Sequence, residues 1–144
     1  MNVKKLKKNK KGFTLVEIIV VLVIIGILMA LAVPAVMKYI NEAAETKVQS
    51  QVRAGYIAAQ SYTTSYVGDH PGADDDELKG QITVKNVNTE LGLTTTTDGG
   101  AITGPDGAVK EISCDVTNRK IDSCTIKVVG SDELYTATQT EIKK

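Results

Sequence analysis

The sequence of 144 residues has no tryptophan, one histidine, two cysteines and one phenylalanine. A Ser–His–Asp or Cys–His catalytic arrangement would depend on His70, which directly precedes Pro71 in a predicted turn. Two cysteines without histidine partners also fall short of the four ligands of a structural zinc site. We find neither a glycine-rich phosphate loop nor paired catalytic carboxylates. The composition therefore predicts a protein that is not an enzyme and that holds no metal and no other cofactor.

Charge is balanced overall but unevenly placed. The chain has 17 basic and 17 acidic side chains, and six of the lysines fall within residues 1–12, which contain no acid. Residues 13–144 keep 11 basic groups against 17 acidic ones, a net charge of −6. An acidic body has no electrostatic footprint for nucleic acid. Asp74–Glu77, the densest acidic stretch, matches no calcium-binding loop and suits the start of a short helix.

Residues 18–37 form a run of twenty residues without a charge. A helix of that length crosses roughly 30 Å of hydrocarbon at about 1.5 Å per residue. Because the lysines lie on its N-terminal side, the N-terminus is expected in the cytoplasm. Two residues weaken the helix: Gly26 costs about 1 kcal/mol relative to alanine, and Pro34 removes the backbone bond to the Ala30 carbonyl. We predict a membrane-spanning helix over residues 13–37.

Three kinds of segment fit this pattern. A plain single-pass anchor would need no role for Glu17 beyond a place near the lipid headgroups. A secretory signal would be cleaved after small residues, within Ala30–Ala32 or near Ala35. This run is longer than an ordinary signal core, and the helical pattern continues beyond it, which favours a third kind of segment, described below.

Beyond the apolar run, the pattern predicts an amphipathic helix over residues 38–66, ending near Ser65–Gly68. Its apolar positions recur every three or four residues: Met37, Ile40, Ala44, Val48, Val52, Tyr56 and Ala59. The rest of the chain is too small to cover a helix of more than fifty residues. The apolar front half must therefore lie in lipid or against other copies of the chain.

The remaining chain divides into a connecting loop region, residues 67–107, and an antiparallel meander, residues 108–144. Gly104–Gly107 (GPDG) is a strong turn signal between the two. Three segments have strand character: Val109–Val116, Ile121–Val129 and Leu134–Thr140. One face of this sheet would receive the amphipathic helix, with core candidates Ile112, Ile126 and Val128. The predicted fold class is α+β, with a long N-terminal helix packed on a small antiparallel sheet.

The two cysteines lie symmetrically about Arg119. A hairpin centred on that residue places Cys114 directly opposite Cys124, which is close enough for a bridge. Export to an oxidising compartment would permit the disulfide. The alternative is a pair of free, buried thiols.

The stretch Gly12–Glu17 (GFTLVE), which follows a lysine-rich leader and precedes an apolar helix, resembles the signature of type IV prepilins, in particular their major-pilin branch. The resemblance implies that prepilin peptidase removes the leader, residues 1–12, by cutting between Gly12 and Phe13. It implies N-methylation of the new Phe13 amine and places Glu17 at the family's acidic position.

The same resemblance marks Gly26 and Pro34 as the helix break, because the stretch between them matches the segment that unwinds in the family's filaments. The chain would then be a structural subunit of an extracellular type IV pilus, supporting adhesion, motility or DNA uptake. Its partners would be copies of itself, prepilin peptidase, and the pilus assembly platform with its ATPase; nucleic acid would be at most an indirect ligand of the fibre.

The expected location is the cytoplasmic (inner) membrane for the single-pass precursor, then the cell-surface pilus. Two alternatives stay open. A pseudopilin of a type II secretion or competence system has a similar N-terminus, and a secreted binding protein would carry an ordinary signal peptide.

If the chain is cut at Gly12, as the resemblance implies, physical chemistry also gives Glu17 a role. A carboxylate in apolar surroundings is costly unless it is paired. In a bundle of identical helices, the positive Phe13 amine of one subunit can meet Glu17 of its neighbour. Helices that slip out of step would leave both charges unpaired, so the pair is expected to set the register of the bundle.

Overall fold

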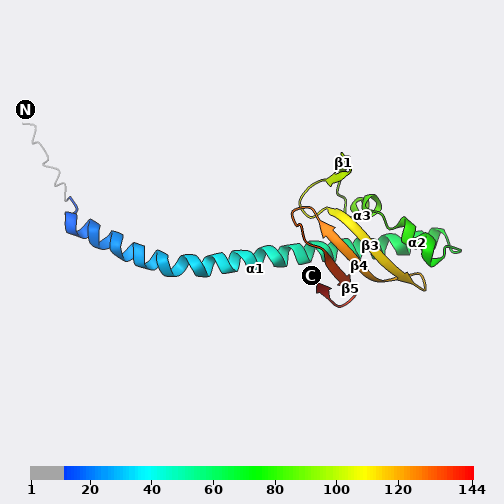
Figure 1. Ribbon diagram of the computed structural model, residues 1–144, viewed down its shortest axis with the longest axis horizontal. Coiled ribbons are helices and arrows are strands. Elements are labelled where there is room, and N and C mark those ends of the chain that lie inside the picture. The colour runs from blue at the N-terminus through cyan, green and yellow to red at the C-terminus, as the bar shows by residue number, and fades with distance from the viewer. Residues whose placement is uncertain (1–11) are drawn as a thin grey trace, which may run out of the picture. The chain divides into compact units, whose positions relative to one another are not determined.

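The computed structural model describes residues 12–144, so the predicted leader lies outside the described residues except for Gly12. The chain forms two compact units, Met1–Glu42 and Ala43–Lys144. One long helix, α1 (Leu15–Asp69), begins in the first unit and ends in the second (Figure 1). The other elements follow in the second unit: α2 (Asp75–Gln81), α3 (Val84–Glu90), β1 (Thr96–Asp98), β2 (Ala101–Thr103), β3 (Val109–Thr117), β4 (Lys120–Val128), β5 (Tyr135–Thr138) and β6 (Ile142–Lys143).

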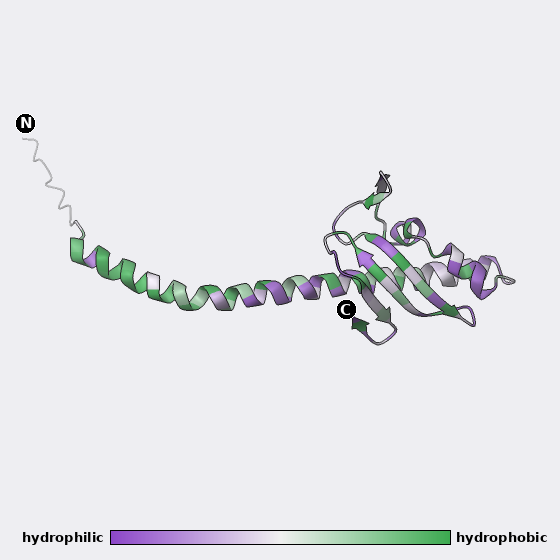
Figure 2. Ribbon diagram, in the orientation of Figure 1, coloured by the Kyte–Doolittle hydropathy of each residue, from purple (hydrophilic) through white to green (hydrophobic). Residues whose placement is uncertain are grey.

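Apolar side chains cover the described part of the first unit, residues 12–42. All of these residues are exposed, and Figure 2 shows an almost unbroken hydrophobic colouring from the start of α1. Phe13 is 78% exposed and Leu31 is 73% exposed. A surface this apolar is not stable in water, so it needs lipid or protein as a partner.

The helix continues through both Gly26 and Pro34 without a break. Proline removes one backbone hydrogen bond, and the turns on either side keep theirs, so a single proline need not end the helix. The predicted break is therefore not seen in the isolated chain, and unwinding between these residues stays a proposal for an assembled state.

A four-stranded antiparallel sheet forms the body of the second unit, in the order β3-β4-β5-β6. In Figure 1, β3, β4 and β5 lie side by side across the last turns of α1, while α2 and α3 contact β3 at the edge of the sheet. Three strands were expected; the fourth, β6, pairs with β5 through Thr136–Lys143 and Ala137–Ile142. The predicted fold class, α+β with a long helix on a small antiparallel sheet, is confirmed.

The core lies between the sheet and the C-terminal half of α1. Val52 and Tyr56 of α1 are buried against Ile126 and Val128 of β4, two of the predicted core residues, whereas the third, Ile112, is only partly buried. Gly55 allows the close approach of helix and sheet, because a Cβ there would lie 3.1 Å from Val109 Cγ2. Of the helix face predicted from sequence spacing, Val48, Val52, Tyr56 and Ala59 pack on the core, whereas Met37, Ile40 and Ala44 are exposed.

Residues 67–107 contain more structure than the connecting loop that the sequence predicted. Helices α2 and α3 and the β1–β2 hairpin all fall within this region. Asp74 caps α2 by accepting a hydrogen bond from Glu77 N at 2.8 Å, and Thr83 caps α3 by accepting from Asn86 N at 3.2 Å. These caps stabilise helices of only two turns, which lack the length to show a clear hydrophobic period.

A buried asparagine joins α3 to the sheet. Asn88 is 1% exposed, its Nδ2 donates to Val109 O, and its Oδ1 accepts from Val109 N, both at 2.8 Å. The side-chain amide thus satisfies both backbone groups of Val109 at the start of β3, as a neighbouring strand would. Because β3 is an edge strand, this contact replaces a missing strand partner.

We expect Asn88→Ala to lower the free energy of unfolding of the second unit by about 3–5 kcal/mol, because it leaves a buried N–H and a buried C=O unpaired. Asn88→Asp should be as harmful near neutral pH and less so in acid, where a protonated carboxyl can again donate to Val109 O. Denaturant unfolding followed by tyrosine circular dichroism measures both. Thr89→Ala, at an exposed position of α3, is the control; a loss for Asn88→Ala no larger than the control's would contradict the role.

The turn before β3 is tied to α1 by charge. Asp106 forms an ion pair with Lys47 and accepts a hydrogen bond from Gln51 Nε2 at 3.4 Å. The contacts with Lys47 first, then with Gln51, hold the pKa of Asp106 below its ordinary value. A carboxyl with a lowered pKa in the folded state adds stability that is present above the pKa of the unfolded chain and is lost as the pH falls through the folded value.

The second unit should therefore lose stability on acidification below about pH 4, and Asp106→Asn should remove part of that loss. The effect is small because both partners are exposed. Thermal unfolding between pH 2 and pH 7 measures it, with Asp98→Asn at an exposed position of β1 as the control. Identical pH profiles for wild type and Asp106→Asn would exclude this contribution.

Candidate functional site

Thr14 caps α1 at its N-terminus, where the sequence predicts the functional residue Glu17. Its Oγ1 accepts a hydrogen bond from Glu17 N at 3.2 Å, and its carbonyl accepts from Ile18 N at 3.3 Å. Thr14 and Glu17 are spaced as the first and last residues of a capping box, in which an acid also complements the positive end of the helix dipole. The helix therefore begins at Leu15 and presents Glu17 in its first turn.

Phe13 and Glu17 are both exposed, and no ion pair involves Glu17 within residues 12–144. A carboxylate thus lies at the margin of an apolar helix without an ion-pair partner among residues 12–144. Gly12, before Phe13, is also exposed, and a Cβ built on it would have no atom within 4 Å. The backbone around the predicted cleavage site is accessible, and the charge that would face a new terminal amine is free to pair with another molecule.

Helix α1 is long and apolar enough to cross a membrane, judged by its length and composition. None of the residues in its most apolar window is buried. The polar residues that follow, including the Lys38–Glu42 pair at 3.7 Å, mark where this apolar surface ends.

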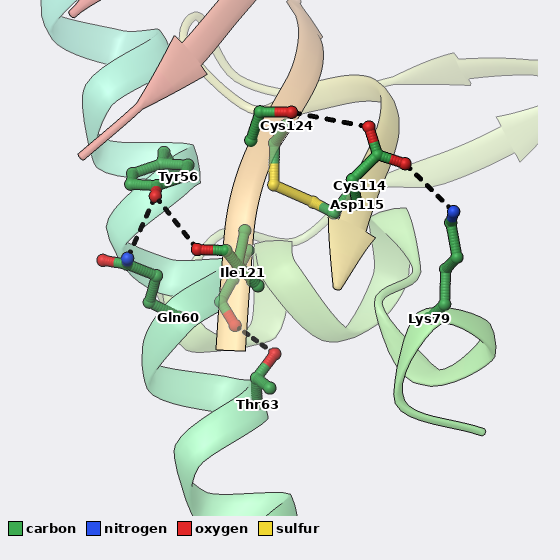
Figure 3. The surroundings of a disulfide bond; sticks show 10 residues. Tyr56, Gln60, Thr63, Lys79, Cys114, Asp115, Ile121 and Cys124 are labelled. Atoms are coloured by element: carbon green, nitrogen blue, oxygen red, sulfur yellow. Dashed lines mark hydrogen bonds and ion pairs between the residues drawn. A yellow bond between two sulfur atoms is a disulfide. The ribbon is translucent and has the colours of Figure 1, made fainter. Parts of the chain in front are cut away.

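The structure joins Cys114 and Cys124 by a disulfide between β3 and β4, with their Cα atoms 4.0 Å apart (Figure 3). The hairpin differs from the one expected. Its turn contains two residues, Asn118 and Arg119, and Asp122 has no opposite residue on β3. Without this bulge, the two-residue turn would place Cys114 opposite Ser123. The bulge therefore restores the cysteine pairing that the sequence predicted from a turn centred on Arg119.

The hairpin turn is held against α2. Asn118 and Arg119 have positive φ angles of 52° and 61°, which is the geometry of a tight hairpin turn but is strained for residues other than glycine. The carboxylate of Asp75 accepts from both backbone amides, from Asn118 N at 3.0 Å and from Arg119 N at 2.7 Å. Part of the acidic stretch that begins at Asp74 thus has a structural role.

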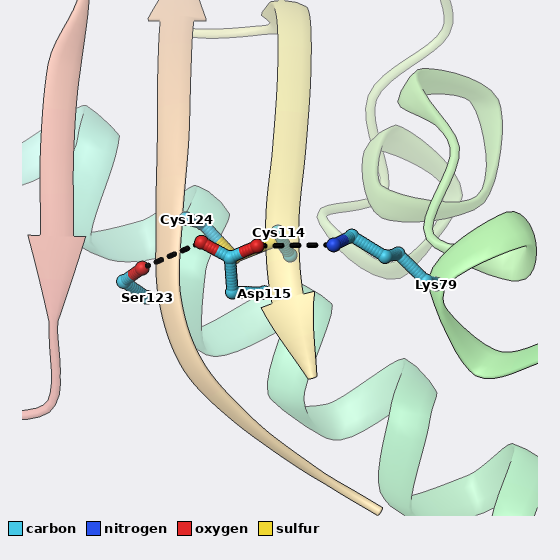
Figure 4. A network of polar contacts seen from close by, with 5 residues as sticks. All are labelled: Lys79, Cys114, Asp115, Ser123 and Cys124. Carbon is cyan, nitrogen blue, oxygen red and sulfur yellow. Dashed lines mark hydrogen bonds and ion pairs between the residues drawn. A yellow bond between two sulfur atoms is a disulfide. The ribbon is translucent and has the colours of Figure 1, made fainter. Parts of the chain in front are cut away.

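A second contact joins the hairpin to α2. Lys79 Nζ lies 3.0 Å from Asp115 Oδ1, and Ser123 Oγ donates to the other carboxylate oxygen at 3.5 Å (Figure 4). Asp115 and Ser123 lie beside the disulfide, on the two strands that it links. On the opposite side, Tyr56 donates to Ile121 O at 3.5 Å, and burial raises the pKa of this tyrosine (Figure 3). The disulfide is thus one of several contacts that stabilise the hairpin.

Within residues 12–144, no three His, Cys, Asp or Glu side chains gather closely enough to hold a metal ion. Three functional or structural residues escaped the sequence analysis: Thr14, Asp75 and Asn88. The Thr-x-x-Glu spacing was a usable signal for Thr14. The other two act across the fold, so no local pattern indicates them.

Comparison with known proteins identifies the N-terminal segment. A family model described as the prokaryotic N-terminal methylation motif matches residues 7–33. The chain is 44% identical to a type IV major alpha-pilin of Moraxella bovis over 52 residues, which are 36% of this chain and 33% of that protein. It is 33% identical to a fimbrial protein of Pseudomonas aeruginosa over 90 residues, 62% of this chain and 53% of that protein.

A third relative is the type II secretion system core protein G of Pseudomonas aeruginosa, 43% identical over 56 residues, which are 39% of each chain. The matches span from a third to about half of the length of these curated relatives. No solved structure matches the chain significantly. The similarity thus includes the capped, acidic start of α1.

Proposed function

We propose, because the N-terminal segment is similar to that of type IV pilins, that the chain is the structural subunit of an extracellular type IV pilus. In this proposal the chain is a substrate and a building block, not a catalyst. The fibre would support adhesion, surface motility or DNA uptake.

One observation supports this function most strongly. The first unit exposes a long apolar helix whose only charge before Lys38 is Glu17. Lipid satisfies such a surface in the precursor, and neighbouring helices satisfy it in a fibre. Hydrophobic contact alone does not set how far one helix slides along another, whereas an acid paired with a terminal amine does.

The steps would follow in order. The precursor lies in the cytoplasmic membrane with its lysine-rich end inside, and prepilin peptidase cuts between Gly12 and Phe13. The Phe13 amine is methylated and keeps its positive charge. Helices then enter the fibre from the assembly platform, driven by its ATPase, with each Phe13 amine paired to Glu17 of a neighbour. Unwinding between Gly26 and Pro34 would adjust the helix to its place in the bundle.

A pseudopilin is the second candidate, supported by the similarity to the type II secretion protein over 56 residues. Imaging of cells that express the chain at its native level separates the two functions. Long surface fibres that contain this subunit support a pilin. Short rods confined to the envelope support a pseudopilin, and the absence of any assembled form would overturn both.

A further inference from the structure

The second unit contains a polar pocket that filament assembly does not explain. It has a volume of about 380 Å³ and lies between the last turns of α1 and the start of β4. Gln60, Thr63 and Thr64 line it from the helix side, and Arg119 and Lys120 line it from the hairpin. Figure 3 shows Gln60 and Thr63 on the turns of α1 that lie beside Ile121 of β4. Its volume falls in the range of small-molecule sites.

The hairpin side of the pocket supplies positive charge. Lys120 forms no ion pair with any described residue, and the guanidinium of Arg119 donates through Nη1 to Pro71 O at 2.8 Å, which leaves its other donors free. No acidic residue lines the pocket. The carboxylate of Asp75 is occupied by the two turn amides, and Asp122 lies at the bulge of β4.

The helix side supplies acceptors instead. The hydroxyls of Thr63 and Thr64 donate to the carbonyls of Ala59 and Gln60, each at 2.8 Å, so their oxygen lone pairs remain for a ligand. Gln60 uses its amide nitrogen on Tyr56 Oη at 3.1 Å, which leaves its carbonyl oxygen. The pocket therefore presents two cations on one wall and hydroxyl and carbonyl acceptors on the other.

We propose that this pocket binds a hydroxylated anion, namely a sugar acid or a sugar phosphate. Its carboxylate or phosphate faces Arg119 and Lys120, where charge-assisted hydrogen bonds are strongest. Its hydroxyl groups donate to Thr63, Thr64 and Gln60. Within a body of net negative charge, unpaired cations at a site without a lining acid favour the binding of such a ligand.

Equilibrium dialysis of the full-length, unassembled protein in detergent tests the proposal with three probes: glucuronate, glucose 6-phosphate and neutral glucose. We expect at least one of the two anions to bind, more weakly as salt is raised, and glucose to bind much less. The pattern between the anions distinguishes a carboxylate from a phosphate ligand. The test does not depend on filament formation, so its failure would leave the proposed function intact.

Lys120→Gln should weaken anion binding about tenfold or more, because it removes a charged hydrogen-bond donor. Lys85→Gln, which removes the same charge from an exposed position of α3, should leave binding unchanged. Intact disulfide and native circular dichroism confirm that the variants are folded. Absence of anion binding, equal binding of glucose, or equal effects of the two lysine variants would each overturn the proposal.

Discussion

Glu17→Gln is expected to leave the precursor correctly processed but to reduce the yield of fibres at least tenfold. The carboxylate is exposed in the isolated chain and pairs with no described residue, so its loss removes little from the subunit itself. In a bundle of apolar helices, however, the variant leaves the Phe13 amine of a neighbour without its counter-ion. Breaking a buried ion pair in this way costs about 3–5 kcal/mol, or a factor of more than one hundred at each contact.

Two controls separate pairing from other effects of the substitution. Glu45→Gln removes a charge from an exposed position further along α1 and should not change the yield. Thr14→Ala removes the hydroxyl that caps α1 and tests whether Glu17 acts only by stabilising the helix start. Fibre mass is measured by shearing cells and weighing subunit recovered per cell. Wild-type yield from Glu17→Gln, or an equal loss with Thr14→Ala, would remove the pairing argument.

Gly12→Leu is expected to block cleavage, so that cells accumulate the full-length precursor and display almost no mature subunit. The resemblance to prepilins implies that the peptidase needs a small residue before the cut. Gly12 lies before the helix, and a Cβ there meets no atom within 4 Å, so the substitution should not disturb the fold.

Two substitutions of different side-chain size at Gly12 test whether size at the cleavage site decides processing. Gly12→Ala should be processed far better than Gly12→Leu, and Gly26→Ala, which changes another unobstructed glycine of the first unit, should be processed as wild type. Immunoblots of membrane fractions separate the precursor from the mature form by size. If the Gly12→Leu variant still yields mature subunit of normal size and amount, the cleavage site must lie elsewhere in the chain.

Helices and strands that are long enough to repeat their hydrophobic pattern could be predicted from the sequence. The run of uncharged residues and the three- to four-residue spacing from Met37 to Ala59 predicted α1, because a helix of many turns repeats its hydrophobic pattern often enough to be recognised. Alternating residues predicted β3, β4 and β5 in the same way. The α+β class followed from one helical face and one sheet face that had to cover each other.

Features that depend on single contacts were not accessible. The acidic stretch Asp74–Glu77 did indicate the start of a short helix, but the extents of α2 and α3, seven residues each, depend on the caps supplied by Asp74 and Thr83. Asn88 acts on Val109, 21 residues away in the sequence. The cysteines were paired from symmetry about Arg119, whereas a two-residue turn and the bulge at Asp122 produce that pairing. Such features arise from tertiary packing, which local patterns do not contain.

Intact mass and N-terminal sequence of subunits sheared from the cell surface test the central claim most directly. The account predicts a chain that begins at Phe13, carries one methyl group on its amine, and is two hydrogens lighter because Cys114 and Cys124 are joined. A chain that begins after Ala32 or Ala35, or that still carries residues 1–12, would contradict it.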